Sequence, residues 1–207
     1  MVSKDSVSFV YIFAADQNEC FKNYLVHFMI DVINVNKELY LRQITHQDAE
    51  EVFDLIDSNR QHLRTWLPFV DTTYTANNTH AFIEQLQKPY CHEMVFTICY
   101  QDAITGLIGF KDIDQPNHRL EIGYWISADN QGKGIVTAVC RALINKAFTR
   151  LKINRIQIKC GIGNMRSSSV PKRLGFTFEG IERAGEKHRN SFIDLEVYSL
   201  LKSEWKS

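Results

Sequence analysis

Residues 121–137 contain the sequence features with the clearest chemical meaning. An apolar segment changes there into a glycine-rich turn at Gly132 and Gly134, and a long amphipathic helix follows. A strand that runs through such a turn into a helix directs unpaired backbone N–H groups and the positive end of the helix dipole at one point. Glycine lets the backbone approach an anion closely, and Lys133 adds a positive charge. The pattern favours a pyrophosphate site, although glycines at a strand-to-helix turn often serve only the turn.

Two other kinds of glycine-rich nucleotide site do not fit this loop. A kinase-type phosphate loop requires G-x-x-x-x-G-K-[ST], but here Gly134 is followed by Ile135 and Val136. A dinucleotide-binding fold requires repeated βαβ units, whereas we expect residues 94–127 to form an antiparallel meander. The sequence therefore excludes both classes of site.

The loop resembles a known acyl-transfer motif. Gln131, Gly134 and Val136 are similar to the Q/R-x-x-G-x-G/A pyrophosphate loop of the GNAT superfamily of N-acetyltransferases, with Val136 where the motif has Gly or Ala. The string EIGYWI…QGKGIVT is similar to the RimJ/RimL-type branch, which acetylates protein N-termini, including those of ribosomal proteins. A second match over residues 160–176 resembles the family's N-x-x-S…G-F segment. The similarity extends from about Glu38 to the end of the chain.

This resemblance implies that acetyl-CoA is the co-substrate. In such a fold two central strands start adjacent and separate, and the pantetheine arm enters between them. The resemblance assigns these residues to acetyl-CoA binding: Trp125, Ile126, Gln131, Gly132, Lys133, Gly134, Ile135, Val136, Thr137, Asn164 and Arg173. Asn164 has a second interpretation as the N-cap of the helix that carries Ser167, because Asn is a preferred capping residue.

Acetyl transfer also needs a neutral amine, a donor to the developing oxyanion and an acid for the departing thiolate. The resemblance makes Ser167 the predicted acid. Glu121 is the predicted base and shares a strand face with Gly123 and Trp125 by the period of two. An ordinary solvated glutamate is the alternative interpretation of Glu121. Glu186, in the loop before the last strand, is a second candidate base.

Several helices and strands must position these residues. Hydrophobic periodicity and capping signals predict their order. We expect a strand near 38–44, helices ending near 57, 67 and 87, strands at 94–100, 107–113 and 119–127, a helix reaching 150, a strand at 154–160, a helix at 167–174, and strands at 176–183 and 192–201. This order predicts a mixed α/β (α+β) class, and the resemblance implies the GNAT fold, a central, mostly antiparallel, splayed sheet flanked by helices.

The N-terminal residues 1–36 differ from the rest because their apolar clusters follow neither a helix nor a strand period. We therefore expect an N-terminal extension at 1–36 and one GNAT domain at 37–207. Family members usually begin just before the first strand. We hypothesise that Met29 is the translation start and that residues 1–28 do not belong to the native protein, which the mass of the native N-terminus would test.

The composition limits the classes of partner and the cellular compartment that we expect for the protein. Lys plus Arg number 24 and Asp plus Glu number 24, so the near-neutral chain lacks the broad basic surface of a nucleic-acid-binding protein. No apolar run reaches the ~18 residues that span a bilayer, and no membrane partner is expected. The five cysteines are odd in number and form no C-x-x-C pair, which predicts reduced thiols in a cytoplasm and no metal site. Cys160 is expected to be a buried strand residue rather than a nucleophile.

The acceptor amine is less well defined by the sequence. The resemblance favours a protein N-terminal α-amine and direct transfer in a ternary complex. A small amine, such as a polyamine or an aminoglycoside, is the alternative acceptor, and a non-catalytic CoA-binding module is the alternative outside enzymes. Trp66 and Phe69 are candidates for lining the acceptor groove, with core packing at a helix end as the other interpretation. Homodimers are common in this branch, but no sequence feature predicts one here.

Overall fold

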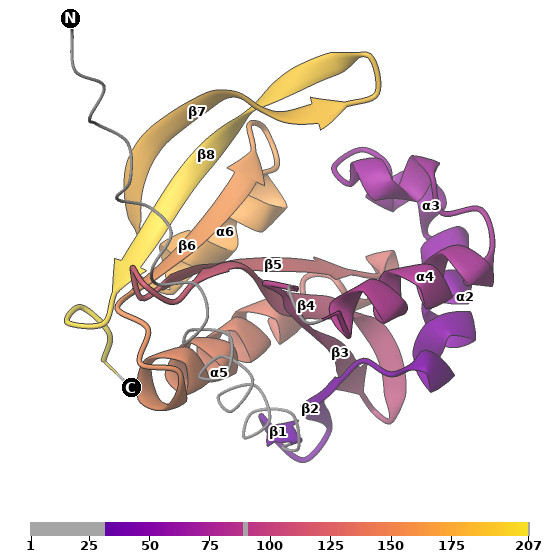
Figure 1. Ribbon diagram of the computed structural model, residues 1–207, viewed down its shortest axis with the longest axis horizontal. Coiled ribbons are helices and arrows are strands. Elements are labelled where there is room, and N and C mark those ends of the chain that lie inside the picture. The colour runs from indigo at the N-terminus through magenta and orange to yellow at the C-terminus, as the bar shows by residue number, and fades with distance from the viewer. Residues whose placement is uncertain (1–31, 89–90, 207) are drawn as a thin grey trace, which may run out of the picture. The chain divides into compact units, whose positions relative to one another are not determined.

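The computed structural model describes residues 32–88 and 91–206, and an eight-stranded sheet organises them (Figure 1). The strands are β1 (Ile33–Asn34), β2 (Leu39–Gln43), β3 (Met94–Tyr100), β4 (Ala103–Asp114), β5 (Arg119–Ile126), β6 (Arg155–Gly161), β7 (Thr177–His188) and β8 (Ser191–Leu201). Their order is β1-β2-β3-β4-β5-β6-β8-β7, and every neighbouring pair is antiparallel except β5–β6. The mixed α/β fold with a mostly antiparallel sheet is confirmed.

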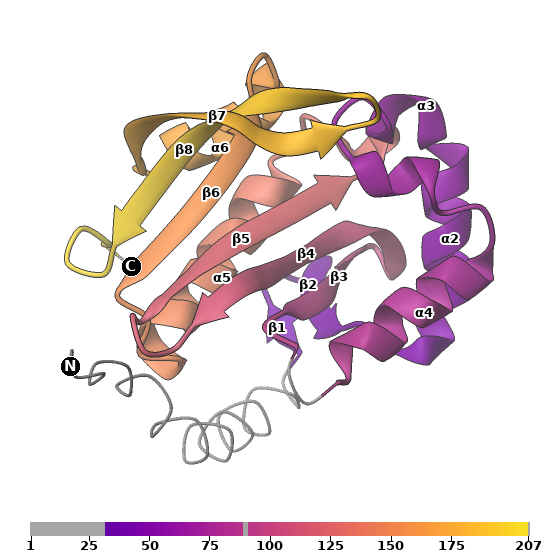
Figure 2. The ribbon, with the colours of Figure 1, turned by 45° about the horizontal axis from the view of Figure 1, so that its top comes forward.

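Helices cover both faces of this sheet. They are α2 (Ala49–Ser58), α3 (Arg60–Leu63), α4 (Ala76–Leu86), α5 (Ile135–Arg150) and α6 (Met165–Arg173). Val52 of α2 and Ile83 of α4 meet Leu107 of β4 in one buried cluster on the first face. Because side chains alternate along a strand, the neighbouring Ile108 points to the opposite face, where α5 runs behind β4 and β5 (Figure 2). Among residues 32–88 and 91–206, no helix has the length and apolar character that crossing a membrane requires.

Three strands differ from the sequence prediction. β7 continues to His188 instead of ending near 183, so Glu186 lies in this strand, opposite Ile193 of β8, and not in a loop. β1 lies within the range 1–36 that we assigned to the extension, and it pairs with β2 through Ile33 opposite Leu41. A two-residue strand has no period to detect. β4 begins before the predicted residue 107 because Gln101 and Asp102 turn the chain with positive φ angles of 51° and 63°, a turn that Asn-Gly usually signals. The hypothesis about Met29 concerns residues outside the described ranges.

Strands β5 and β6 provide the predicted splay. They pair in parallel only at their first residues, from Arg119 opposite Arg155 to Glu121 opposite Gln157. Beyond this point the two strands diverge, as Figure 2 shows, while β6 continues to pair with β8 up to Gly161. The edge of β5 after Glu121 therefore has no strand partner on the β6 side.

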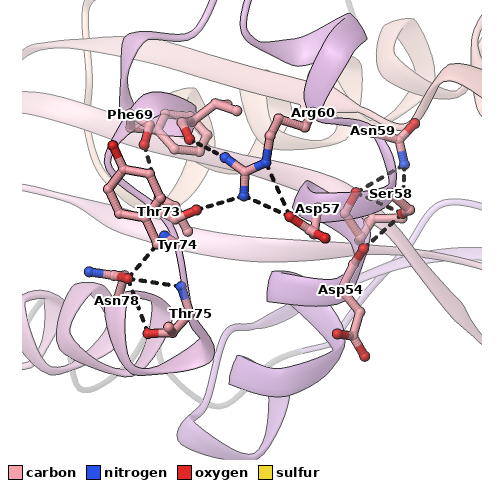
Figure 3. A network of polar contacts seen from close by, with 12 residues as sticks. Asp54, Asp57, Ser58, Asn59, Arg60, Phe69, Thr73, Tyr74, Thr75 and Asn78 are labelled. Carbon is pink, nitrogen blue, oxygen red and sulfur yellow. Dashed lines mark hydrogen bonds and ion pairs between the residues drawn. The ribbon is translucent and has the colours of Figure 1, made fainter.

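Arg60 orders the segment that connects α3 to α4 (Figure 3). Its guanidinium donates to the backbone oxygens of Val70, at 2.5 Å, and Thr73, at 2.7 Å, and it also pairs with Asp57. Buried carbonyl groups need donors, and one arginine supplies two of them here. The contacts fix the segment that carries Trp66.

Glu179 of β7 connects this edge strand to β6 across the intervening β8. Its two carboxylate oxygens accept from Arg155 of β6 at 2.7 and 2.5 Å, and Ser199 of β8 donates to it at 2.7 Å. The Arg155 hydrogen bonds, aided by Ser199, lower the pKa of Glu179 from 4.5 to about 2. A carboxylate with a depressed pKa stabilises the fold above its unfolded pKa and loses this contribution as the pH falls toward its folded pKa.

We therefore expect Glu179→Gln to be less stable than the wild type at pH 7, and the difference to shrink as the pH falls from about 4.5 toward 2. The urea unfolding midpoints of both proteins at pH 7, 4 and 3 would measure this difference in stability. Glu84→Gln, at an exposed position, controls for the loss of one carboxylate. A difference that stays constant over this range would contradict the prediction.

Candidate active site

A cavity of about 990 Å³ opens between the diverging parts of β5 and β6. Both strands contribute to its wall, together with the loop before α5 and the first turns of α5 and α6. These predicted site residues line it: Glu121, Trp125, Ile126, Gln131, Gly132, Gly134, Ile135, Val136, Thr137, Asn164, Ser167, Arg173 and Glu186. The fold thus brings together residues that are up to 65 positions apart in the sequence, from Glu121 to Glu186.

The glycine-rich loop forms one end of the cavity. Gly132 and Gly134 have φ angles of 73° and 77°, in the left-handed region that favours glycine, and Gly134 is the N-cap of the 16-residue helix α5. A Cβ at either glycine would meet nothing within 4 Å, so the loop faces open space. Helix N-terminal amides beside an open space form a suitable anion site.

Two arginines place positive charge at this end. Arg173 donates to the Thr137 hydroxyl at 2.8 Å, and Arg166 donates to the side-chain oxygen of Gln131. The Nε2 atom of His62 lies 2.6 Å from the amide nitrogen of Gln131. Burial, together with the nearby charge of Arg166, lowers the pKa of His62, so the neutral ring can accept from this amide. The Gln131 side chain is therefore held by His62 of α3 and by Arg166 of α6.

Lys133 is the one predicted cofactor-binding residue that does not line the cavity. Its ammonium donates to Asn130 at 3.0 Å and lies 5.7 Å from the ring centroid of Tyr100. These contacts engage the ammonium, and among the lining residues Arg166 and Arg173 supply the positive charge beside the glycine loop that we had expected from Lys133.

Ser167 lies in the first turn of α6, beside the point where β5 and β6 have separated. The Asn164 side chain caps this helix and accepts from the Ser167 backbone N–H at 3.1 Å, so the capping interpretation of Asn164 is confirmed. The Ser167 hydroxyl lies 3.2 Å from the Cys160 sulfur and 3.3 Å from the Tyr124 hydroxyl. Burial raises the pKa of the Cys160 thiol to about 11, so this thiol keeps its proton at neutral pH.

Glu121 is buried, and the interpretation as a solvated strand glutamate is wrong. Its side chain is 5% exposed, with Oε1 2.7 Å from the ammonium of Lys111 and Oε2 3.9 Å from that of Lys159. Burial opposes the charge of Lys111, but the charge and hydrogen bond of Glu121, together with the charges of Asp112 and Glu186, raise the pKa of Lys111. The Gln157 amide also reaches Oε2, at 3.5 Å. The site therefore holds a carboxylate matched by two cations.

Of the remaining candidates, Glu186 and Trp66 line the cavity and Phe69 does not. Glu186 lines the cavity and pairs with His188 at 3.0 Å. Trp66 also lines it, and its indole ring packs against Gly161, where an added Cβ would lie 3.3 Å from the ring. Phe69 is not a lining residue and is 39% exposed, so neither groove lining nor core packing describes it.

Sequence reasoning missed several residues that contribute to the cavity. Tyr124, Lys111 and Lys159 contact the predicted catalytic residues, and His62 and Arg166 contact the loop. Tyr124 stands inside the quoted EIGYWI string and Arg166 inside the second match over residues 160–176, which were the available signals. His62, Lys111 and Lys159 come from separate elements without a motif, and only the strand register and helix placement bring them to the site.

Comparison with known proteins agrees with this geometry. The family described as Acetyltransferase (GNAT) domain matches residues 38–177. The protein YdaF of Bacillus subtilis (strain 168) is 38% identical over 174 residues, which cover 83% of this chain and 95% of YdaF. The ribosomal-protein-serine acetyltransferase of Escherichia coli (strain K12) is 29% identical over 175 residues, which cover 83% of this chain and 97% of that protein.

Solved structures show the same similarity. A structure of RimL, a ribosomal L7/L12 alpha-N-protein acetyltransferase in complex with coenzyme A, matches with a TM-score of 0.78 and 25% identity. The match covers 83% of this chain and 98% of RimL. The resemblance to the RimJ/RimL type is thus confirmed. The chain belongs to the GNAT family and is an N-acetyltransferase.

Proposed function

We propose that this enzyme uses acetyl-CoA to acetylate the α-amine of a protein N-terminus, by direct transfer in a ternary complex. The observation that carries the proposal is that Ser167 and Glu121 line the same cavity as the glycine loop. An acid, a carboxylate and an anion site can therefore act on one bound donor and acceptor. The names of the Escherichia coli relative and of RimL support a protein α-amine as the acceptor.

The chain's own residues fit acetyl-CoA. The amides around Gly132 and Gly134, with Arg166 and Arg173 beside them, would hold the pyrophosphate. The pantetheine arm would lie along the free edge of β5, where the backbone of residues 125–126 can hydrogen-bond it as a neighbouring strand would. Acetyl-CoA supplies the reactive thioester, and the protein supplies the orientation.

In the transfer, the acceptor nitrogen forms a bond to the thioester carbon and the carbon–sulfur bond breaks. One proton moves, in net terms, from nitrogen to sulfur. Oε2 of Glu121 is the proposed acceptor of the amine proton, directly or through water, and the Ser167 hydroxyl is the proposed donor to the sulfur. The protonated Cys160 does not compete as a nucleophile.

The glycine loop provides a matched pair of variants. Gly134 and Gly175 have nearly equal φ angles, 77° and 79°, and a Cβ at either would meet nothing within 4 Å. Alanine in this conformation costs about 1 kcal/mol at each position. We expect both Gly→Ala variants to lose similar stability, but only Gly134→Ala to weaken CoA binding, by about 10-fold, as the loop relaxes away from its anion-binding shape. Titration calorimetry with CoA and thermal melts measure the two effects, and equal CoA affinity in both variants would contradict the role of the loop.

The acceptor class can be tested with paired peptides. We would incubate the enzyme with acetyl-CoA and a peptide that has a free N-terminus and one internal lysine, beside the same peptide with a formylated N-terminus. Mass spectrometry should find acetylation of the first peptide at its N-terminus and none of the second. Faster acetylation of spermidine or an aminoglycoside than of any peptide would favour a small-amine acceptor. CoA binding without transfer to any acceptor would favour a binding module.

A further inference from the structure

A chain of hydrogen bonds connects three buried or partly buried polar groups beside the cavity. Tyr124, on β5, donates from its hydroxyl to the backbone oxygen of Ser167 at 3.0 Å. The Ser167 hydroxyl donates to the Tyr124 oxygen at 3.3 Å, and the Cys160 sulfur lies 3.2 Å from the Ser167 oxygen. Tyr124 thus contacts Ser167 twice, once through its backbone and once through its side chain.

The directions of these hydrogen bonds follow from the number of protons. A tyrosine hydroxyl has one proton, and that of Tyr124 is committed to the Ser167 carbonyl, so its oxygen is free only to accept. The Ser167 proton then points to Tyr124, and the Cys160 thiol can donate to the Ser167 oxygen. Burial raises the pKa values of both Tyr124 and Cys160, so both groups keep their protons at neutral pH. Every proton in this chain has an acceptor.

We infer that Tyr124 is a positioning residue that sets the place and rotamer of the Ser167 hydroxyl for acetyl transfer. One bond holds the helix turn that carries Ser167, and the other holds the hydroxyl itself. This inference rests on the proposed role of Ser167 as the acid. During the transfer, the Ser167 proton would turn from the Tyr124 oxygen to the departing sulfur, while Tyr124 keeps its own proton on the Ser167 backbone oxygen.

The position of Tyr124 in the sheet supports this role. Trp125 packs against the buried cluster of α2–α4, and side chains alternate along β5, so Tyr124 points to the face of α5 and α6. It therefore approaches Ser167 from the strand whose free edge lines the cavity. The pairing of β5 with β6 ends at Glu121. Beyond that point, the Tyr124 side chain links β5 to α6, the helix that follows β6.

A double-mutant cycle tests the inference. Tyr124→Phe keeps the ring and removes both hydrogen bonds, so we expect kcat to fall about 10-fold while the KM for acetyl-CoA stays unchanged. In a Ser167→Ala background the same change should have no further effect on kcat, because the hydroxyl that it positions is gone. Tyr198→Phe, which removes a buried hydroxyl bonded to Glu196, is the control and should keep full activity. Thermal melts confirm that each variant is folded.

The possible results separate this inference from the function on which it rests. An unchanged kcat in Tyr124→Phe, with a large loss in Ser167→Ala, would overturn the positioning role and leave the acid role intact. Equal losses from Tyr124→Phe in both backgrounds would also overturn it, because Tyr124 would then act independently of Ser167. Full activity of Ser167→Ala would overturn the acid assignment and this inference with it.

Discussion

Ser167→Ala is expected to lower kcat by about 10²–10³-fold, the range typical of losing one general acid. The two neighbouring proton-bearing groups contact Ser167 itself: the Tyr124 hydroxyl donates to its backbone oxygen at 3.0 Å, and the Cys160 sulfur lies 3.2 Å from its hydroxyl. We therefore expect neither group to replace the lost hydroxyl fully. The affinity for CoA should change little, since the Asn164 cap of α6 bonds the backbone N–H of residue 167 rather than the side chain. Steady-state kinetics with saturating peptide and calorimetric CoA binding measure the two quantities.

A second serine variant controls for this result. Ser58, at the exposed end of α2, donates to the backbone oxygen of Asp54, and Ser58→Ala should keep the wild-type kcat. A Ser167→Ala enzyme with normal turnover would show that the departing thiolate takes its proton from elsewhere, for example from water. A loss of CoA affinity equal to the loss of kcat would instead indicate that Ser167 binds the donor and does not assist its departure.

The sequence predicts most elements of this fold because the signals are local. Period-two and helical patterns lie within single elements, and the Thr45–Asp48 capping box and Pro89 are adjacent to the helices that they delimit. The divergence of β5 from β6 was expected only through the family resemblance. Pairing between strands depends on side chains far apart in the sequence, and no local pattern records where a parallel pair stops.

The environment of Glu121 shows why the site was harder to predict. Asp114 pairs with Arg119, and counting back from this pair without interruption would place Asp112 opposite Glu121. A register shift between Lys111 and Asp114, where Asp112 has a φ of 49°, places Lys111 there instead. One extra residue in a strand thus exchanges a repelling carboxylate for an attracting ammonium. The sequence marked Glu121 as a candidate base, but the burial of its side chain and its pairing with Lys111 depend on this bulge.

Glu121→Gln is expected to lower kcat/KM for the acceptor amine about 100-fold or more. Lys111 engages Oε1 at 2.7 Å, whereas the contacts of Oε2 are longer, 3.5 Å to Gln157 and 3.9 Å to Lys159. Oε2 is therefore the oxygen with capacity to accept a proton. Glutamine preserves the shape but takes no proton. It also removes the short ion pair of Lys111, whereas Lys159 keeps its pair with Glu182 at 2.7 Å. Kinetics with a peptide acceptor, together with CoA binding as a reference, measure the effect.

Glu186→Gln is the matched comparison, because it removes the other candidate carboxylate of the same cavity. Its side chain is 42% exposed and already pairs with His188 at 3.0 Å, so water screens its charge and a partner occupies one oxygen. We expect this variant to change kcat/KM little. The opposite ranking, with Glu186→Gln inactive and Glu121→Gln active, would move the base to β7. Equal losses would mean that both carboxylates take part in the reaction, and the Glu121→Gln/Glu186→Gln double variant would then show whether they act as a unit, with no further loss, or independently, with additive losses.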